Sequence, residues 1–223
     1  MKRMHRAKNL STRDIGGDVT TRGESMRVWS IQPEKLYEDL KIKKALHCDP
    51  TQSELITECG FGPAYDWLVR QMKERVGLPP KGGLYPFWAW HTLEWKHQRP
   101  DLRRMEFRAY KGDQVCLELE IPDNMVLLSN ENTWHIVLND GYYGDSSNEQ
   151  EAEIEDHWFE SLPLDEKAVV KMKSWKKIFN VSPPYEDAWE CQGKYVQATF
   201  WELRLDQVVA VRRFKGRLNR LNT

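Results

Sequence analysis

The stretch Gln114-Val-Cys-Leu-Glu-Leu-Glu-Ile121 decides the fold class, because apolar and polar side chains alternate along its whole length. Successive side chains of a strand point to opposite faces, so this segment would bury one face and present its glutamates on the other. The apolar face consists of Val115, Leu117, Leu119 and Ile121. Such alternation is typical of an antiparallel sheet that covers a core with one side.

On both sides of this strand, hydrophobic periodicity predicts a mixed order of strands and helices. Further strands are expected at 27–31, 105–110, 125–128, 195–205 and 208–214. The last two would form a closing hairpin. Helices are expected near 33–40, 63–76, 130–138, 148–160 and 165–179. This order is not a regular β-α-β alternation, so we predict an α+β fold with a central, mostly antiparallel sheet, packed helices and a helical insertion near residues 145–182.

The length of 223 residues predicts one large domain with two tails. Residues 1–25 are rich in arginine and lysine and show no period, which favours a flexible basic tail over a basic arm for nucleic acid. The regular pattern begins at Met26, so translation itself is expected to start there. Residues 26–214 would form the single domain, and residues 215–223 a basic C-terminal tail.

Composition excludes several classes of protein. The chain is 40% hydrophobic and 30% charged, as in globular proteins, and its formal net charge is −1, so no global field attracts nucleic acid or a membrane surface. No apolar run is long enough to span a bilayer, and the N-terminus lacks the apolar segment of a secretory signal. The four cysteines are scattered, as expected for reduced thiols. We therefore expect a cytoplasmic protein with no membrane partner and no nucleic-acid partner.

The aromatic stretch Tyr85-Pro-Phe-Trp-Ala-Trp-His-Thr-Leu-Glu-Trp95 is the first candidate for a pocket. Aromatic rings with a polar handle serve both in cores and in sites that bind flat ligands. Trp88 and Trp90 would share one face of a strand, and Trp201 lies in a second strand flanked by polar residues. We take these three indoles and Tyr85 as candidate ligand-binding residues, with core packing as the alternative for all of them.

Charged residues supply the remaining candidates. Arg27 or Arg104 would bind an anionic group of a ligand, and Glu202 would orient or activate a hydroxyl as the catalytic residue. Glu118 and Glu120 share a strand face, which indicates a solvated face more readily than an acid–base pair. The histidines lack the spacing of metal ligands, so no metal site is expected. The sequence also lacks the phosphate-binding, dinucleotide, zinc-protease and serine-hydrolase motifs.

Several blocks rich in rare residues recur in one order along the chain. They are Met26-Arg-Val-Trp-Ser-Ile-Gln-Pro33, Tyr85-Pro-Phe-Trp-Ala-Trp90, Asp101-Leu-Arg-Arg-Met-Glu-Phe107, Val115-Cys-Leu-Glu-Leu-Glu-Ile-Pro122 and Tyr195-Val-Gln-Ala-Thr-Phe-Trp-Glu-Leu-Arg-Leu-Asp-Gln-Val208. As a set they resemble the bacterial family known as domain of unknown function 3841, over about residues 26–214. The resemblance implies a bacterial, soluble, single-domain protein and brings no catalytic residues with it.

Two hypotheses about function follow. The first is a domain that binds a small molecule or nucleotide, with an ADP-ribosyltransferase-like enzyme that uses NAD as its sharper form. That form rests on an analogy of strand order for Arg27, Tyr85 and Glu202, and the Glu-x-Glu and Ser-Thr-Ser patterns of such enzymes are missing. The second is a non-enzymatic interaction module whose acidic run, residues 149–166, faces a protein partner. The sequence leaves open the cofactor and whether the protein is an enzyme.

Overall fold

The computed structural model describes residues 23–49, 51, 56, 58–182 and 192–217, and its centre is an antiparallel sheet. The six strands of this sheet lie in the order β5-β6-β3-β1-β4-β8, and each strand is antiparallel to its neighbours. They are β1 (Ser25–Pro33), β3 (Phe87–Leu93), β4 (Asp113–Pro122), β5 (Leu127–Asn130), β6 (Tyr195–Phe200) and β8 (Val208–Lys215). A second, two-stranded sheet joins β2 (Ala45–His47) to β7 (Glu202–Arg204). The α+β prediction is confirmed.

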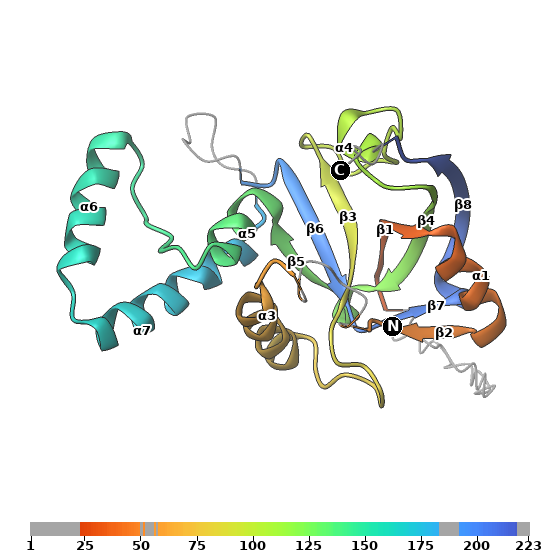
Figure 1. Ribbon diagram of the computed structural model, residues 1–223, viewed down its shortest axis with the longest axis horizontal. Helices are drawn as coiled ribbons and strands as arrows, with labels where there is room; N and C mark the ends of the chain where they lie inside the picture. The colour runs from red at the N-terminus through yellow and green to blue at the C-terminus, as the bar shows by residue number, and fades with distance from the viewer. Residues whose placement is uncertain (1–22, 50, 52–55, 57, 183–191, 218–223) are drawn as a thin grey trace, which may run out of the picture.

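Helices cover both faces of the sheet and enclose two cores (Figure 1). Leu40 of α1 (Glu34–Lys43) packs with the apolar face of β4. On the other face, α3 (Gly62–Arg75), α5 (Glu131–Leu138) and the 3-10 helix Trp175–Phe179 form a second, aromatic cluster. Phe87 belongs to the first cluster and its neighbour Trp88 packs against the second, as the alternation of side chains along a strand requires.

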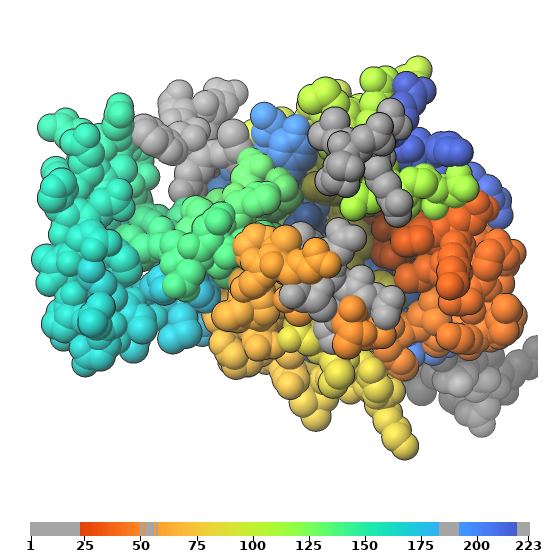
Figure 2. All heavy atoms as spheres, viewed as in Figure 1, coloured from red at the N-terminus to blue at the C-terminus, as the bar shows by residue number. Residues whose placement is uncertain are grey.

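The predicted helical insertion forms an arm that projects from the body at one end of the molecule (Figures 1 and 2). The arm consists of α6 (Glu149–Ser161) and α7 (Leu164–Ser174). Asn148 caps α6, because its side chain accepts a hydrogen bond from the backbone N–H of Glu151 at 3.0 Å. Neither helix buries a residue fully. Within the described ranges, no helix has the length and apolar character needed to cross a bilayer.

The prediction of a strand at 105–110 is wrong. Met105–Arg108 form the short helix α4, which follows a turn stabilised by Asp101. The carboxylate of Asp101 accepts hydrogen bonds from the backbone N–H of Arg103 at 3.0 Å and from its guanidinium at 2.7–3.2 Å. These local hydrogen bonds favour a turn over a strand. The hydrophobic pattern of the sequence does not reveal them, so it predicted a strand.

The last two strands also differ from the prediction. The expected strand 195–205 breaks at Trp201, where β6 ends in the main sheet and β7 turns toward β2. A 3-10 turn at Leu205–Gln207 then redirects the chain, and β8 pairs with β4 instead of closing a hairpin. The register of β8 places Val211 opposite Leu117, so β8 extends the apolar face that β4 begins.

Both ends of the described chain take part in the main sheet. The strand β1 begins at Ser25, whose hydroxyl donates to Glu120 at 3.0 Å, and the carbonyl of Glu24 accepts from the N–H of Asp123. At the other end, Lys215 closes β8 and the N–H of Gly216 donates to the carbonyl of Gly112 at 2.9 Å. Residues 1–22 and 218–223, the remainder of both predicted tails, lie outside the described residues.

The polar face of β4 is less solvated than expected. The Glu118 side chain is only 8% exposed and accepts hydrogen bonds from Arg27 at 3.1 Å and from Arg99 at 3.1 Å. Glu120, two residues along the same face, is 48% exposed. The loop that follows β3 supplies Arg99 and covers this part of the sheet, so the same strand face is buried at one glutamate and open at the next.

We expect Glu118→Gln to lower the free energy of unfolding by about 1–3 kcal/mol, because the buried carboxylate accepts charge-assisted hydrogen bonds from Arg27 and Arg99 that a neutral amide would weaken. Glu120→Gln is the matched control and should cost less than about 0.5 kcal/mol. Urea unfolding followed by circular dichroism measures both. Equal effects of the two substitutions would contradict the burial of Glu118.

Candidate ligand-binding cleft

Strands β1 and β3 are neighbours in the sheet, but their register consists of a single pair, Trp29 opposite Trp90. Along the rest of their length, β1 pairs with β4 and β3 pairs with β6. The hydroxyl of Ser30 donates to the carbonyl of Trp88 at 2.8 Å and bridges the two strands just past the pair. Toward Pro33 and Phe87 the strands therefore separate, and the sheet opens between them.

A cleft of about 740 Å³ lies at this opening. Its volume falls in the range of about 300–1,000 Å³ that is common for small-molecule sites. The walls come from the end of β1, from α1, from β2, from the start of β3, from one residue of β6 and from Tyr110. The lining residues are Ile31, Gln32, Pro33, Lys35, Leu36, Asp39, Lys43, Leu46, His47, Cys48, Asp49, Pro86, Phe87, Trp88, Ala89, Trp90, Tyr110 and Gln197.

The aromatic lining combines flat surface with unpaired polar atoms. Trp88 packs edge-on against Tyr65, with ring centroids 6.0 Å apart, and Trp90 lies opposite Gln197 in the register. Nε1 of Trp88 and Oε1 of Gln197 are buried and have no hydrogen-bond partner among the described residues. A buried donor or acceptor without a partner costs about 1–3 kcal/mol, so a polar ligand that paired with these atoms would recover that free energy.

His47 connects the predicted catalytic residue to the cleft. It lies opposite Glu202 in the small sheet, and its Nε2 is 3.2 Å from Oε1 of Glu202. This distance is short enough for an ion pair, but the geometry is not that of a hydrogen bond. Nε2 of His47 therefore has no hydrogen-bond partner among the described residues. The Glu202 side chain is 17% exposed and also lies 3.5 Å from Arg204. Glu202 is not itself a lining residue, and it reaches the cleft through His47.

Charged side chains of both signs surround the mouth of the cleft. Lys35 and Lys43 project from α1, are exposed, and form no ion pair with a described residue. Asp39 lies between them on the same helix and is also a lining residue. Two cations without carboxylate partners at the edge of an aromatic cleft are suited to an anionic group on a ligand.

Arg27, predicted to bind an anion, lies on β1 away from the cleft. Its guanidinium donates to Glu118 at 3.1 Å and to Glu120 at 3.2 Å. Both carboxylates belong to β4, the strand next to β1. The charge of Arg27 is thus compensated within the sheet, and the structure does not bring it together with Tyr85 or Glu202.

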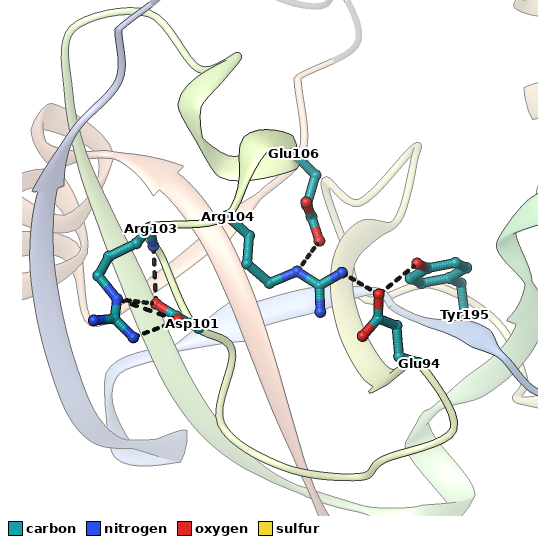
Figure 3. Close-up of polar contacts among 6 residues, drawn as sticks. All are labelled: Glu94, Asp101, Arg103, Arg104, Glu106 and Tyr195. Atoms are coloured by element: carbon teal, nitrogen blue, oxygen red, sulfur yellow. Dashed lines mark hydrogen bonds and ion pairs between the residues drawn. The ribbon is translucent and has the colours of Figure 1, made fainter.

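Arg104 lies in a separate network beside α4 (Figure 3). Its guanidinium contacts Glu94 at 2.5 Å and Glu106 at 2.7 Å, and Glu94 also accepts a hydrogen bond from Tyr195 at 3.3 Å. The bond to Glu94 raises the pKa of Arg104 and lowers that of the carboxyl. Arg103 is held in the same way by Asp101, as Figure 3 shows. Arg104 does not line the cleft.

Tyr85 and Trp201, two further predicted site residues, act in packing. The hydroxyl of Tyr85 donates to Asp66 at 2.5 Å, and this bond raises the pKa of Tyr85 to about 12, with burial as a smaller cause. Trp201 is 6% exposed and its Nε1 donates to the carbonyl of Gly77 at 2.9 Å. Of the seven predicted site residues, only Trp88 and Trp90 line the cleft.

The lining residues His47, Gln197 and Lys35 were not identified from the sequence. His47 belongs to a strand of three residues whose partner, β7, comes much later in the chain. Gln197 alternates with apolar residues in β6 and resembles any polar residue of a strand. The position of Lys35 just before the apolar stripe of α1 could be read from the sequence. It did not mark Lys35 as a lining residue, because an exposed lysine on a helix is usually only solvated.

Cysteine and metal chemistry receive no support from the described residues. Burial raises the pKa of Cys48 and of Cys116, which keeps both thiols protonated at neutral pH. Cys48, Cys59 and Cys116 are free, and Cys191 lies outside the described residues. In those ranges, no group of three or more His, Cys, Asp or Glu side chains could hold a metal ion.

Comparison with known proteins gives one match. A family model described as a domain of unknown function, number 3841, matches residues 27–209, which confirms the resemblance found in the sequence. No curated protein and no solved structure matches the chain.

Two stacked histidines lie beside the β1–β3 pair. The rings of His91 and His97 are 4.1 Å apart at an interplanar angle of 21°, and Nε2 of His97 donates to the carbonyl of Arg27 at 2.7 Å. Burial, and to a smaller extent the neighbouring His97, lowers the pKa of His91 to about 4. His91 is therefore neutral at pH 7.

This pKa predicts a loss of stability in acid. Between about pH 6.5 and pH 4 the unfolded chain binds a proton at His91 that the folded chain does not, so the free energy of unfolding falls as the pH falls through this window. Thermal unfolding from pH 7.5 to 4.5 measures the slope. His91→Gln should flatten it, whereas His135→Gln, on the exposed side of α5, should not. Identical slopes for the wild type and His91→Gln would contradict a neutral His91.

Proposed function

Because the chain belongs to the domain of unknown function 3841 family, whose description assigns no activity, we propose a function from the cleft alone: it binds a nucleotide or a similar small molecule. The observation that carries the proposal is the opening of the sheet between β1 and β3, which exposes Trp88 and Trp90 to a cleft of about 740 Å³. We place the protein in the bacterial cytoplasm, as the family resemblance and the scattered cysteines imply.

The cleft offers complementary contacts to a planar heterocycle. Indole surface at Trp88 and Trp90 supports stacking or edge contact with a flat ring. Nε1 of Trp88 would donate to a ring acceptor, and Oε1 of Gln197 would accept from a ring amine. Both contacts would satisfy atoms that otherwise stay buried without a partner, so they favour a base over a plain aliphatic ligand.

The cations on α1 favour a phosphate on the same ligand. Lys35 and Lys43 lie at the mouth of the cleft, and neither has an ion pair with a described residue. His47 also lines the cleft and contacts Glu202, so the pair would accept a proton from a hydroxyl of the bound ligand. NAD belongs to the nucleotides that fit this description. Arg27 and Tyr85 have no part in the proposal, because each is bonded to carboxylates outside the cleft.

AMP, NAD and adenosine test the proposal in a thermal-shift experiment. A ligand present at about a hundredfold excess over its Kd should raise Tm by about 5–10 °C in a chain of this size. Lys35→Gln combined with Lys43→Gln should reduce the shift with AMP and leave the shift with adenosine unchanged. Gln197→Met should reduce both shifts.

Lys73→Gln, an exposed change on α3, is the control for loss of charge and should leave every shift unchanged. The proposal fails if no nucleotide or nucleoside stabilises the wild-type protein, or if the Gln197 variant responds as the wild type does.

A second candidate function is association of two copies through the arm. On α6 the side chains of Ile154 and Trp158 are 67% and 47% exposed and lie one helical turn apart on the same face. On α7, Leu164 and Val169 are 86% and 62% exposed. An arm that projects from the body with apolar side chains uncovered is typical of a surface that packs against another protein.

Sedimentation velocity over a range of concentrations measures this association. The wild type should form dimers, and Ile154→Lys with Trp158→Lys should remain monomeric because charges would be buried between the arms. Val209→Lys, an exposed apolar position on β8, is the matched control and should leave dimerisation intact. A wild-type protein that is monomeric throughout would exclude association of like copies.

A further inference from the structure

A basic groove lies at the edge of the sheet, between the end of β8 and the segment that carries α4. It is open to solvent and has a volume of about 1130 Å³. Its cationic lining residues are Arg103, Arg108, Arg212, Arg213, Lys215 and Arg217. None of the described residues that line it is acidic. The net charge of −1 for the whole chain conceals this local concentration of positive charge.

Among the described residues, two of these cations are compensated by close ion pairs. Arg103 contacts Asp101 at 2.7 Å and Arg213 contacts Glu34 at 2.5 Å. Lys215 is 80% exposed and lies 4.0 Å from Asp113, a weak pair at the surface.

The other three arginines have neutral partners or none in the described ranges. Arg212 donates to the carbonyl of Pro100 at 2.9 Å and to Sγ of Cys116 at 3.5 Å, so neither partner cancels its charge. Arg108 and Arg217 form no ion pair with any described residue. The groove therefore keeps a surplus of positive charge that no carboxylate of the described chain balances.

The backbone holds this arrangement in place. The N–H of Arg217 donates to the carbonyl of Arg108 at 2.9 Å, which fixes the two arginines side by side. Gly216 makes this approach feasible, because a Cβ there would lie 1.7 Å from the carbonyl oxygen of Tyr110. The main chain therefore brings two arginines without a described ion pair into the same part of the groove, where an anion would interact favourably with both.

We propose that the basic groove binds a ligand with several phosphate groups in a row. Arginine is suited to phosphate because its planar fork donates two parallel hydrogen bonds to one phosphate group. Residues 212–217 line the open groove along the end of β8, where Arg213 and Lys215 lie about 7 Å apart on one side of the strand, so the groove fits an extended chain of charges better than a single ion. A single-stranded nucleic acid and a free oligophosphate share this chemistry.

A short fluorescein-labelled oligothymidylate and inorganic tripolyphosphate are the two probes. Fluorescence anisotropy at low salt measures binding of the oligonucleotide, and tripolyphosphate and polyglutamate are added as competitors. We expect tripolyphosphate to compete and polyglutamate, which carries carboxylates in place of phosphates, not to compete. Affinity that grows with the length of the oligonucleotide identifies a nucleic-acid strand as the ligand, whereas a rise in Tm with tripolyphosphate and no anisotropy change with any oligonucleotide identifies a small oligophosphate.

Arg108→Gln combined with Arg217→Gln should weaken binding of either probe by tenfold or more. With the single-stranded oligonucleotide it should also reduce the slope of log Kd against log salt by about 1.4, about 0.7 for each lost phosphate contact. Both side chains are exposed, so this variant should fold, and its Tm checks that it does. Lys73→Gln with Lys173→Gln removes the same charge from α3 and α7 and should bind as the wild type does.

Three results would overturn the proposal. The first is that neither probe binds. The second is that polyglutamate displaces the oligonucleotide as effectively as tripolyphosphate does. The third is that the groove variant binds no more weakly than the lysine control. A shift of Tm by AMP in the cleft is independent of all three, because the lining residues of the cleft and of the groove do not overlap.

Discussion

The architecture depends on the single pair Trp29–Trp90, which is the whole register between β1 and β3. Every other neighbouring pair in the main sheet extends over four or more residue pairs. Hydrogen bonding across the sheet is therefore cooperative within the halves β5-β6-β3 and β1-β4-β8 and weak between them. Packing must join the halves, and it does so through the two cores on opposite faces and through the bond from Ser30 to Trp88. The cleft is a consequence of that weak joint.

Elements whose signal is local could be predicted from the sequence, and elements that depend on distant partners could not. The alternation in β4 and the apolar stripe of α3 were sufficient to identify these two elements and the apolar side chains that face the core, although the polar face of β4 is more buried than its pattern indicated. The pairing of β8 with β4, and of β2 with β7, has no local signature. The site followed the same rule: Trp88 and Trp90 were found by residue type, whereas His47 reaches the cleft only because of a pairing that the sequence does not reveal.

Charge compensation explains why the predicted anion-binding arginines were misplaced. A sequence shows which arginines exist but not which carboxylates fold beside them. Arg27 and Arg104 each contact two glutamates, and those glutamates come from β4, from the end of β3 and from α4. Arg108 and Arg217 attract less notice in the sequence, yet no carboxylate of the described residues forms an ion pair with them. The informative quantity is the charge that remains after folding, and tertiary contacts decide it.

Tyr110 lines the cleft and also contacts Gly216, a lining residue of the groove. Its side chain lines the cleft, and its carbonyl oxygen lies against Gly216, next to the arginines of the groove. A displacement of this residue by an occupant of one region would change the geometry of the other. Thermodynamic linkage then requires reciprocity: if occupancy of the cleft alters affinity in the groove by some factor, occupancy of the groove alters affinity in the cleft by the same factor. One tightly packed glycine would in that case make two separate surfaces a coupled system.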